Sequence, residues 1–202
     1  MRTNRKIFSA AVVEPASILA PLDLSDTFGR TAPLEVDLGC GDGAFLVALA
    51  QQDQARDFLG VERLAGRWRG ASRKIGHLQL GNARILRAEI LHALQHLLPP
   101  KSVDVFHLLF PDPWPKRRHE TRRIFNPVFL RAIARALKED GILRVVTDDA
   151  AYFRVMQATL VHAPMQLRIA TEFDASQLPS STFGERFRER GTEIHQLALR
   201  KR

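Results

Sequence analysis

The chain has 202 residues, of which 45% are hydrophobic, and this length allows one globular domain with short extensions. Lys and Arg outnumber Asp and Glu by 30 to 22, and the resulting net charge of +8 favours an acidic partner, most often nucleic acid. A single cysteine, Cys40, excludes an internal disulfide framework and a cysteine-rich zinc site, so no metal is expected. No uncharged apolar run approaches the roughly 18 residues of a membrane helix. Glu14 and Pro15 interrupt the apolar stretch near the start, so we expect no signal peptide and a cytoplasmic location.

Residues 1–30 have weak periodicity and several helix breakers, and we interpret them as an N-terminal arm on a domain formed by residues 31–202. Within that domain, runs typical of strands alternate with runs typical of helices, which predicts an α/β fold with a mostly parallel sheet and helices on both faces. The expected strands are 34–39, 57–62, 83–88, 103–110 and 141–147, and the expected helices are 44–51, 63–77, 90–98, 124–138 and 150–161. Two late alternating segments, 165–173 and 193–199, are expected to form an antiparallel C-terminal edge, which makes seven strands.

A glycine-rich turn follows the first expected strand. Gly39, Gly41 and Gly43 stand where the strand turns into its helix, and glycines there permit a tight turn and close approach of a ligand. The spacing also matches a dinucleotide-binding fingerprint loosely. However, Asp37 and Asp42 would face a pyrophosphate with two negative charges at short range, and a helix N-terminus compensates only modestly. A ligand with a cationic centre and an ammonium group, such as S-adenosylmethionine, therefore suits this turn better.

Two further carboxylates follow the next expected strands. Glu62 ends the second strand, 23 positions after Gly39, where an acid accepts hydrogen bonds from a ribose diol. Glu89 ends the third strand, where an acceptor can meet an adenine amino group. Because the carboxyl ends of parallel strands form the ligand crevice of an open α/β sheet, these two acids and Asp37 are expected to belong to one site. Cys40 has no histidine near it in the sequence, so we expect a packing residue and not a nucleophile.

A proline-rich loop follows the fourth expected strand. Three prolines within the five residues 111–115 fix φ and remove amide donors, so the loop is predicted to be stiff and extended. The loop holds one carboxylate, Asp112, and one indole, Trp114, which either stacks a base or covers the core. Five cations follow: Lys116, Arg117, Arg118, Arg122 and Arg123. This combination predicts a site that holds a polyanion and acts on a base.

The glycine turn after Asp37 resembles the first motif of class I S-adenosylmethionine-dependent methyltransferases. The run from Pro111 to His119, with Arg122-Arg123 after it, is similar to the signature of bacterial tRNA (guanine-N7-)-methyltransferases. The similarity extends from about residue 34 to the C-terminus with the motifs in the same order. It implies a Rossmann-like fold, S-adenosylmethionine as the cofactor and tRNA as the partner. The implied reaction is methyl transfer to N7 of a guanine in the variable loop of tRNA.

The same resemblance implies roles for individual residues. The implied cofactor site contains Asp37, Gly39, Gly41, Glu62, Glu89 and Asp112. Asp112 also serves catalysis in that family. The implied substrate contacts are Lys116, Asp148, Thr182 and Glu185. The family mostly has Glu at the position of Asp37 and Asp at the position of Glu89; both exchanges keep the charge, so we expect adjusted geometry and retained binding.

Other functions fit parts of the same pattern. An amino-group methyltransferase acting on another RNA base or on a protein would carry its acid and prolines in a different order after the fourth strand. A nicotinamide-dependent Rossmann oxidoreductase is disfavoured by Asp37 and Asp42, and a catalytically silent RNA-binding module has no use for an acidic pocket. A second group of cations is either a solvated helix face or another RNA-binding patch: Arg63, Arg67, Arg69, Arg73 and Lys74.

Overall fold

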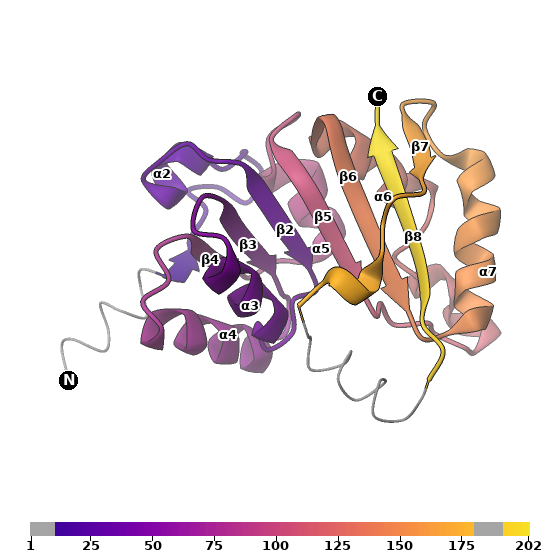
Figure 1. Cartoon of the computed structure of the whole chain (residues 1–202), viewed down its shortest axis with the longest axis horizontal. Coiled ribbons are helices and arrows are strands. Elements are labelled where there is room, and N and C mark those ends of the chain that lie inside the picture. Colours follow the sequence, from indigo (N-terminus) through magenta and orange to yellow (C-terminus); the bar gives the residue numbers. More distant parts are fainter. Residues whose placement is uncertain (1–10, 180–191) are drawn as a thin grey trace.

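A single sheet of eight strands runs through the part of the chain that the computed structural model describes, residues 11–179 and 192–202 (Figure 1). The strand order is β1-β4-β3-β2-β5-β6-β8-β7. The strands are β1 (Val12–Val13), β2 (Leu34–Leu38), β3 (Asp57–Val61), β4 (Ala83–Leu86), β5 (Val103–Leu109), β6 (Leu137–Thr147), β7 (Leu167–Ala170) and β8 (His195–Lys201). All pairs among β1 to β6 are parallel, whereas β8 is antiparallel to both β6 and β7.

The expected mostly parallel sheet with an antiparallel C-terminal edge is confirmed, but the expected number of seven strands is too low by one. The additional strand is β1, which comes from the segment interpreted as an arm and pairs in parallel with β4. Two residues are too short a stretch to show the alternation by which strands are predicted. Leu22 and Phe28 from the same segment are also buried in the core, and the Leu22 amide donates to the Leu97 carbonyl.

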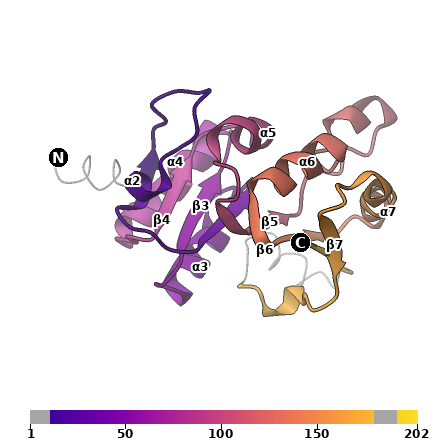
Figure 2. The same ribbon diagram turned by 90° about the horizontal axis from the view of Figure 1, so that it is seen from above.

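Helices cover both faces of the sheet, and Figure 2 shows α3 on one side of the strands and α6 on the other. The α-helices are α2 (Leu24–Phe28), α3 (Ala44–Gln52), α4 (Ala65–His77), α5 (Ile90–His92), α6 (Pro127–Ala136) and α7 (Ala150–Thr159). Short turns of other helix types are η1 (Ala93–Leu97), η2 (Arg117–Arg122), η3 (Leu160–His162) and η4 (Ala175–Gln177). No helix in the described ranges has the length and apolar character needed to cross a membrane.

The hydrophobic core has one large cluster on each face of the sheet. Side chains of α3 and α4 pack on one face, where Leu46 and Ile75 meet Phe58 of β3. The other face is covered by η1, α6 and α7, which bury Phe129 and Met156 against β2, β5 and β6. The two layers place the carboxyl ends of the central strands, and the turns that leave them, at one edge of the sheet.

Helix α6 shows why the expected helix over residues 124–138 is too long. The Asn126 side chain caps the helix by accepting from the amides of Val128 and Phe129, both at 3.0 Å, and Pro127 occupies the first helical position. At the other end Leu137 adopts an extended conformation and begins β6. The apolar periodicity continues beyond both ends, so it overestimates the length of the helix.

Candidate active site

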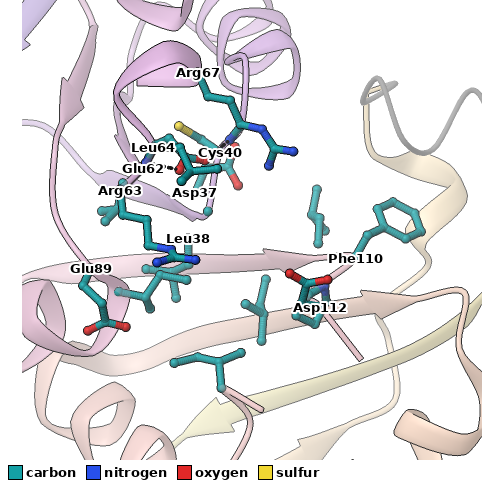
Figure 3. A pocket seen from close by; sticks show the side chains of 18 of the residues that line it. Asp37, Leu38, Cys40, Glu62, Arg63, Leu64, Arg67, Glu89, Phe110 and Asp112 are labelled. Carbon is teal, nitrogen blue, oxygen red and sulfur yellow. Dashed lines mark hydrogen bonds between the residues drawn. The ribbon is translucent and has the colours of Figure 1, made fainter. Parts of the chain in front are cut away.

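A cavity of about 690 Å³ lies at the carboxyl ends of β2, β3, β4 and β5 (Figure 3). Its volume lies in the usual range for small-molecule sites. All six residues of the expected cofactor site line it: Asp37, Gly39, Gly41, Glu62, Glu89 and Asp112. Lys116 and Asp148 are not among the lining residues, and Thr182 and Glu185 lie outside the described residues. The structure therefore brings the glycine turn and the proline loop together, although more than 70 residues separate Asp37 from Asp112.

The glycine turn connects β2 to α3 in a conformation that side chains disfavour. Gly39, Gly41 and Gly43 have φ values of 81°, 58° and 76°. The amides of Gly39 and Cys40 donate to the Val61 carbonyl at 2.8 and 3.1 Å, which fixes the turn to the end of β3. At Gly41 a Cβ atom would meet no other atom within 4 Å, so the turn leaves open space on its cavity side.

Asp37 is a buried carboxylate on the cavity wall, with 4% of its surface exposed. Burial and, to a smaller extent, the negative charge of Glu62 together raise the pKa of Asp37 to about 7. Near neutral pH this carboxyl group therefore holds a proton about half of the time. A ligand cation placed beside it would stabilise the charged form and release that proton.

Glu62 joins the glycine turn to the loop between β3 and α4. One carboxylate oxygen accepts from the Gly41 amide at 3.1 Å, and the other accepts from the Leu64 amide at 2.7 Å. The side chain is buried, with 5% of its surface exposed, yet it lines the cavity. Backbone donors thus hold Glu62 in one orientation and leave further lone pairs on both oxygens for a ligand.

Asp42 and Cys40 of the glycine turn have different surroundings. Asp42 forms an ion pair with Lys74 of α4, with 2.5 Å between Nζ and Oδ2, so its charge is offset. The argument against a pyrophosphate thus rests on Asp37 and Glu62 instead. Cys40 is buried, and burial raises the pKa of its thiol well above the ordinary value. A protonated, buried thiol agrees with the expected packing role.

The proline loop is rigid and holds two residues in an uncommon conformation. Phe110 and Trp114 have φ values of 50° and 43°, and each precedes a proline, which restricts the preceding residue to extended conformations. Such strain persists only where surrounding contacts enforce it. The Phe110 amide donates to the Val146 carbonyl at 2.7 Å. The guanidinium of Arg123 donates to the carbonyls of Pro113 at 2.8 Å and Trp114 at 3.3 Å.

The side chains of the proline loop divide between the cavity and the solvent. Trp114 is half-buried and lines the cavity, with the Arg122 guanidinium 4.9 Å from its ring centroid and the His119 ring edge-on at 5.5 Å. Asp112 is exposed at the cavity mouth, and Lys116 lies outside it, also exposed. Of the five cations that follow the loop, Arg123 serves to hold it in place, because its side chain is 85% buried by the contacts above.

Asp148 follows the last residue of β6, and β6 pairs in parallel with β5. It is half-buried at the same edge of the sheet as the proline loop. The next residue, Asp149, caps α7 by accepting from the Tyr152 amide at 2.7 Å. The Thr147-Asp148 pair therefore lies next to the cavity edge but does not contribute to its wall.

The sequence did not indicate that two arginines line the cavity. Arg63 and Arg67, interpreted as members of a helix patch, contribute to the wall beside Glu62. Figure 3 shows both side chains in the pocket together with the acids. Arg63 directly follows the strand-end carboxylate Glu62, and this position is the signal that could have identified it. The apolar part of the wall includes Leu108, Ile90 and Ile124.

Comparisons with known proteins agree with this arrangement. Residues 31–197 match a family model described as "Putative methyltransferase". The tRNA (guanine-N(7)-)-methyltransferase of Leifsonia xyli subsp. xyli (strain CTCB07) is 40% identical to this chain over 176 residues, which cover 86% of this chain and 76% of that protein. Proteins of the same name from Edwardsiella ictaluri (strain 93-146) and Alkalilimnicola ehrlichii (strain ATCC BAA-1101 / DSM 17681 / MLHE-1) are 36% and 35% identical. They match over 86% and 90% of this chain, and 73% and 78% of their own lengths.

Solved structures of methyltransferases share the fold at low sequence identity. The 16S rRNA methyltransferase KamB superposes with a TM-score of 0.63 at 15% identity, over 90% of this chain and 93% of that one. A structure described as an antibiotic-related methyltransferase gives a TM-score of 0.61 at 18% identity, over 94% and 96%. The fold is thus the Rossmann-like fold of methyltransferases. With the match of the family model and the identity to curated relatives over most of the chain, the protein belongs to the tRNA (guanine-N(7)-)-methyltransferase family.

Proposed function

We propose that the protein transfers a methyl group from S-adenosylmethionine to N7 of a guanine in the variable loop of tRNA. The observation that carries this proposal is the meeting, in one cavity, of the acids at the ends of β2, β3 and β4 with Asp112 and Trp114 of the proline loop. Membership of the family supports the reaction and the substrate. The amino-group methyltransferase and the nicotinamide-dependent oxidoreductase are not favoured by these relatives.

The cavity fits S-adenosylmethionine. The Asp37 carboxyl group forms no ion pair or hydrogen bond with any described residue, and burial raises its pKa, so a cation such as the amino group of the cofactor would stabilise its charged form. Glu62 is oriented to accept from a ribose diol, and Glu89 at the mouth suits the adenine amino group. The open space at Gly41 lets the ligand approach the backbone. When bound, this cofactor supplies a methyl group activated by a sulfonium.

Little proton transfer is required from the protein. Guanine N7 carries a free lone pair in the plane of the ring, so attack needs no general base. The residues must instead align the base, and positioning of this kind can lower a barrier by several kcal/mol, up to about 7–11 kcal/mol in ideal cases. Trp114, which contacts Arg122 and His119 on the cavity wall, can stack the guanine, a contact usually worth about 1–3 kcal/mol.

Asp112 is the residue that we propose for catalysis. It is exposed at the mouth of the cavity on a loop that the prolines and Arg123 keep rigid. Its carboxylate can accept from N1–H or the exocyclic amine of guanine, and it stabilises the positive charge that develops on the ring as N7 is methylated. A fixed carboxylate suits this role because it needs no reorganisation during the reaction.

Four residues are proposed as contacts to the tRNA outside the cavity. Lys116 is exposed beside the proline loop, and Asp148 follows β6 at the same edge of the sheet. Thr182 and Glu185 are assigned by the family motif alone. The domain that carries out the reaction is proposed to comprise residues 31–202, with residues 1–30 as an arm that adds β1 to the sheet.

The proposal is tested by transfer of labelled methyl from S-adenosylmethionine to unmodified tRNA, followed by nucleoside analysis. We expect 7-methylguanosine from the wild type, none from Asp112→Ala, and normal product from the control Asp26→Ala, which changes an exposed acid of α2. Label in another nucleoside would show that the modified atom is wrong. Absence of label under conditions where S-adenosylhomocysteine raises Tm would show that tRNA is not the substrate. A rise in Tm with NAD instead would favour the oxidoreductase.

A further inference from the structure

Two short segments hold more positive charge than the whole chain has in surplus. Residues 63–77 contain five Lys and Arg residues and no acid, and residues 116–123 contain five with a single Glu. Because the net charge of the chain is +8, the remaining residues are close to neutral. The charge is therefore concentrated in two places, and a concentrated charge marks the surface that meets a polyanion.

The two cationic segments flank the same cavity. Arg63 and Arg67 line its wall from the loop after β3 and the start of α4, whereas Trp114 and Arg122 line it from the proline loop and η2. In Figure 3, Arg67 is seen on the same side of the pocket as Cys40 and Asp37, and Asp112 is seen on the other side. Since β3 and β5 lie on opposite sides of β2 in the sheet, the segments approach the cavity mouth from opposite directions.

Packing does not explain the arginines of α4. The helix buries Ala71 and Ile75 and leaves Arg69 and Arg73 exposed, one turn apart on its outer face. Neither side chain forms an ion pair or a hydrogen bond with any residue in 11–179 or 192–202. By contrast, the exposed Arg30 pairs with Asp57, and the partly buried Lys138 and Arg200 pair with Asp104 and Glu172.

Helix stability does not explain these arginines either. Arg67 stands in the first turn of α4, where the helix macrodipole favours an acid, and that turn contains no acid. The N-cap residue, Leu64, provides no side-chain cap. Among residues 11–179 and 192–202, Lys74 is the one cation of the helix with an ion-pair partner, which is Asp42 of the glycine turn. A solvated helix face normally mixes both signs of charge at a spacing of three or four residues, and α4 does not.

We propose that Arg63, Arg67, Arg69 and Arg73 form a second binding surface for the phosphate backbone of tRNA, on the side of the cavity opposite the proline loop. This inference rests on the proposed function, since it takes tRNA as the polyanion. Four of the five cations in this segment are arginines, whose planar fork binds phosphate in a bidentate manner. Contacts on both sides of the cavity fix the direction in which the RNA crosses it, and phosphate contacts of this kind set register without reading sequence.

The test compares two double variants with the same change of charge. Arg69→Gln/Arg73→Gln alters the outer face of α4 without touching the cavity wall, and Arg131→Gln/Arg168→Gln removes two exposed arginines from α6 and β7. The α4 variant is expected to raise the Kd and the KM for tRNA roughly fivefold at moderate salt. It should also reduce the slope of log Kd against log salt by roughly 0.7–0.9 for each lost contact. The affinity for S-adenosylhomocysteine and the kcat at saturating tRNA should stay unchanged, and the control should match the wild type.

The outcomes separate this surface from the proposed function. If methyl transfer proceeds and the α4 variant keeps the KM and salt slope of the control, the surface is wrong and the function stands. If the α4 variant loses salt-dependent tRNA binding while the wild type transfers no methyl group to tRNA, the surface stands and the function is wrong. Arg69→Lys/Arg73→Lys should restore most of the salt slope, because the charge returns. If the double glutamine variant is unstable, Arg73→Gln alone should show about half of the effect on the slope.

Discussion

At the scale of single residues, Asp37 connects protonation to both stability and ligand binding. Its carboxyl group is buried beside Glu62 without a compensating cation, which raises its pKa from 3.8 to about 7. An unfolded chain would release this proton near the ordinary value. The folded protein without ligand therefore binds more protons than the unfolded chain between these two pH values, and its stability depends on pH in that window.

The first prediction concerns the stability of the protein without ligand. Because the pKa of Asp37 is raised in the folded state, the stabilisation is complete at low pH and is lost as pH rises from about 4 through about 7. The side chain of the Asp37→Asn variant cannot ionise, so the variant does not lose this stabilisation. The Tm of the variant minus the Tm of the wild type should therefore increase with pH over that range and stay constant above it. Melting curves at a series of pH values measure the difference. A difference that stays constant with pH would show that Asp37 does not titrate in this window.

The second prediction concerns the affinity for S-adenosylhomocysteine. The ligand ammonium pairs with the charged form of Asp37, so binding below pH 7 has to release a proton. As the pH increases toward the pKa of Asp37, the affinity should rise by about tenfold for each pH unit. Above that pKa the affinity should no longer depend on pH. Titration calorimetry in two buffers of different ionisation enthalpy measures the released proton. Asp37→Asn should bind more weakly and without this pH dependence, and equal slopes for both proteins would contradict the proposed contact.

Gly43 belongs to the same turn and carries the third prediction. Its φ is 76°, and a Cβ atom there would lie 2.7 Å from the Cβ of Ala71 on α4. Gly43→Ala therefore adds a steric clash to a cost of about 1–2 kcal/mol for the left-handed conformation. We expect a loss of more than about 2 kcal/mol in the free energy of unfolding. Gly41 has a φ of 58°, but a Cβ atom there would have no neighbour within 4 Å. In denaturant titrations, Gly41→Ala should therefore lose only the free energy that the left-handed conformation costs an alanine.

At the scale of elements, the side chain of Arg123 supports the shape of the proline loop. Arg123 donates to the carbonyls of Pro113 and Trp114 and lies 3.7 Å from a carboxylate oxygen of Glu120. Trp114 keeps its strained conformation while these contacts hold. The cations after the loop thus have different tasks, since Arg123 supports the loop and Arg122 covers one face of the Trp114 ring.

The fourth prediction concerns the role of Arg123 in supporting the proline loop. Arg123→Ala should lower kcat by about ten- to a hundredfold, because a displacement of about 1 Å at the reacting groups can cost that much. The Kd for S-adenosylhomocysteine should change little, since Glu62 and the glycine turn do not depend on Arg123. Arg123→Lys should recover only part of the rate, because a lysine lacks the planar fork that reaches both carbonyls. Equal kcat for Arg123→Ala and Arg131→Ala would show that Arg123 does not position the loop.

At the scale of the whole molecule, local patterns and long-range contacts differ in how well the sequence indicates them. The alternation of strand and helix patterns predicted the parallel sheet, and the rule that ligands bind at strand ends predicted that Asp37, Glu62 and Glu89 meet. The strand β1 was missed because two residues are too few to show the alternation of apolar and polar residues that predicts a strand. The pairing of Asp42 with Lys74 joins residues 32 positions apart, and no local pattern encodes it.

The difference between local patterns and long-range contacts also explains why the sequence did not indicate the positions of three arginines in the site. The inward position of Arg123 depends on carbonyls nine and ten residues away, whose directions follow from the strained φ values of the loop. The cavity positions of Arg63 and Arg67 depend on how α4 leaves β3. Identity and spacing of residues thus indicated which groups meet at the edge of the sheet, whereas the direction of each long cationic side chain required the folded chain.

The order of strands in the sheet also has a consequence for folding kinetics. The cavity is lined by residues from 37–67, 88–90 and 108–124, and the first and last of these segments become neighbours only when β5 pairs with β2 through Glu35 and Val105. Closing a loop of this length is slow compared with forming the local helices. Recovery of ligand binding during refolding must therefore follow the docking of β5 onto β2, and a fluorescent ligand analogue would time this step directly.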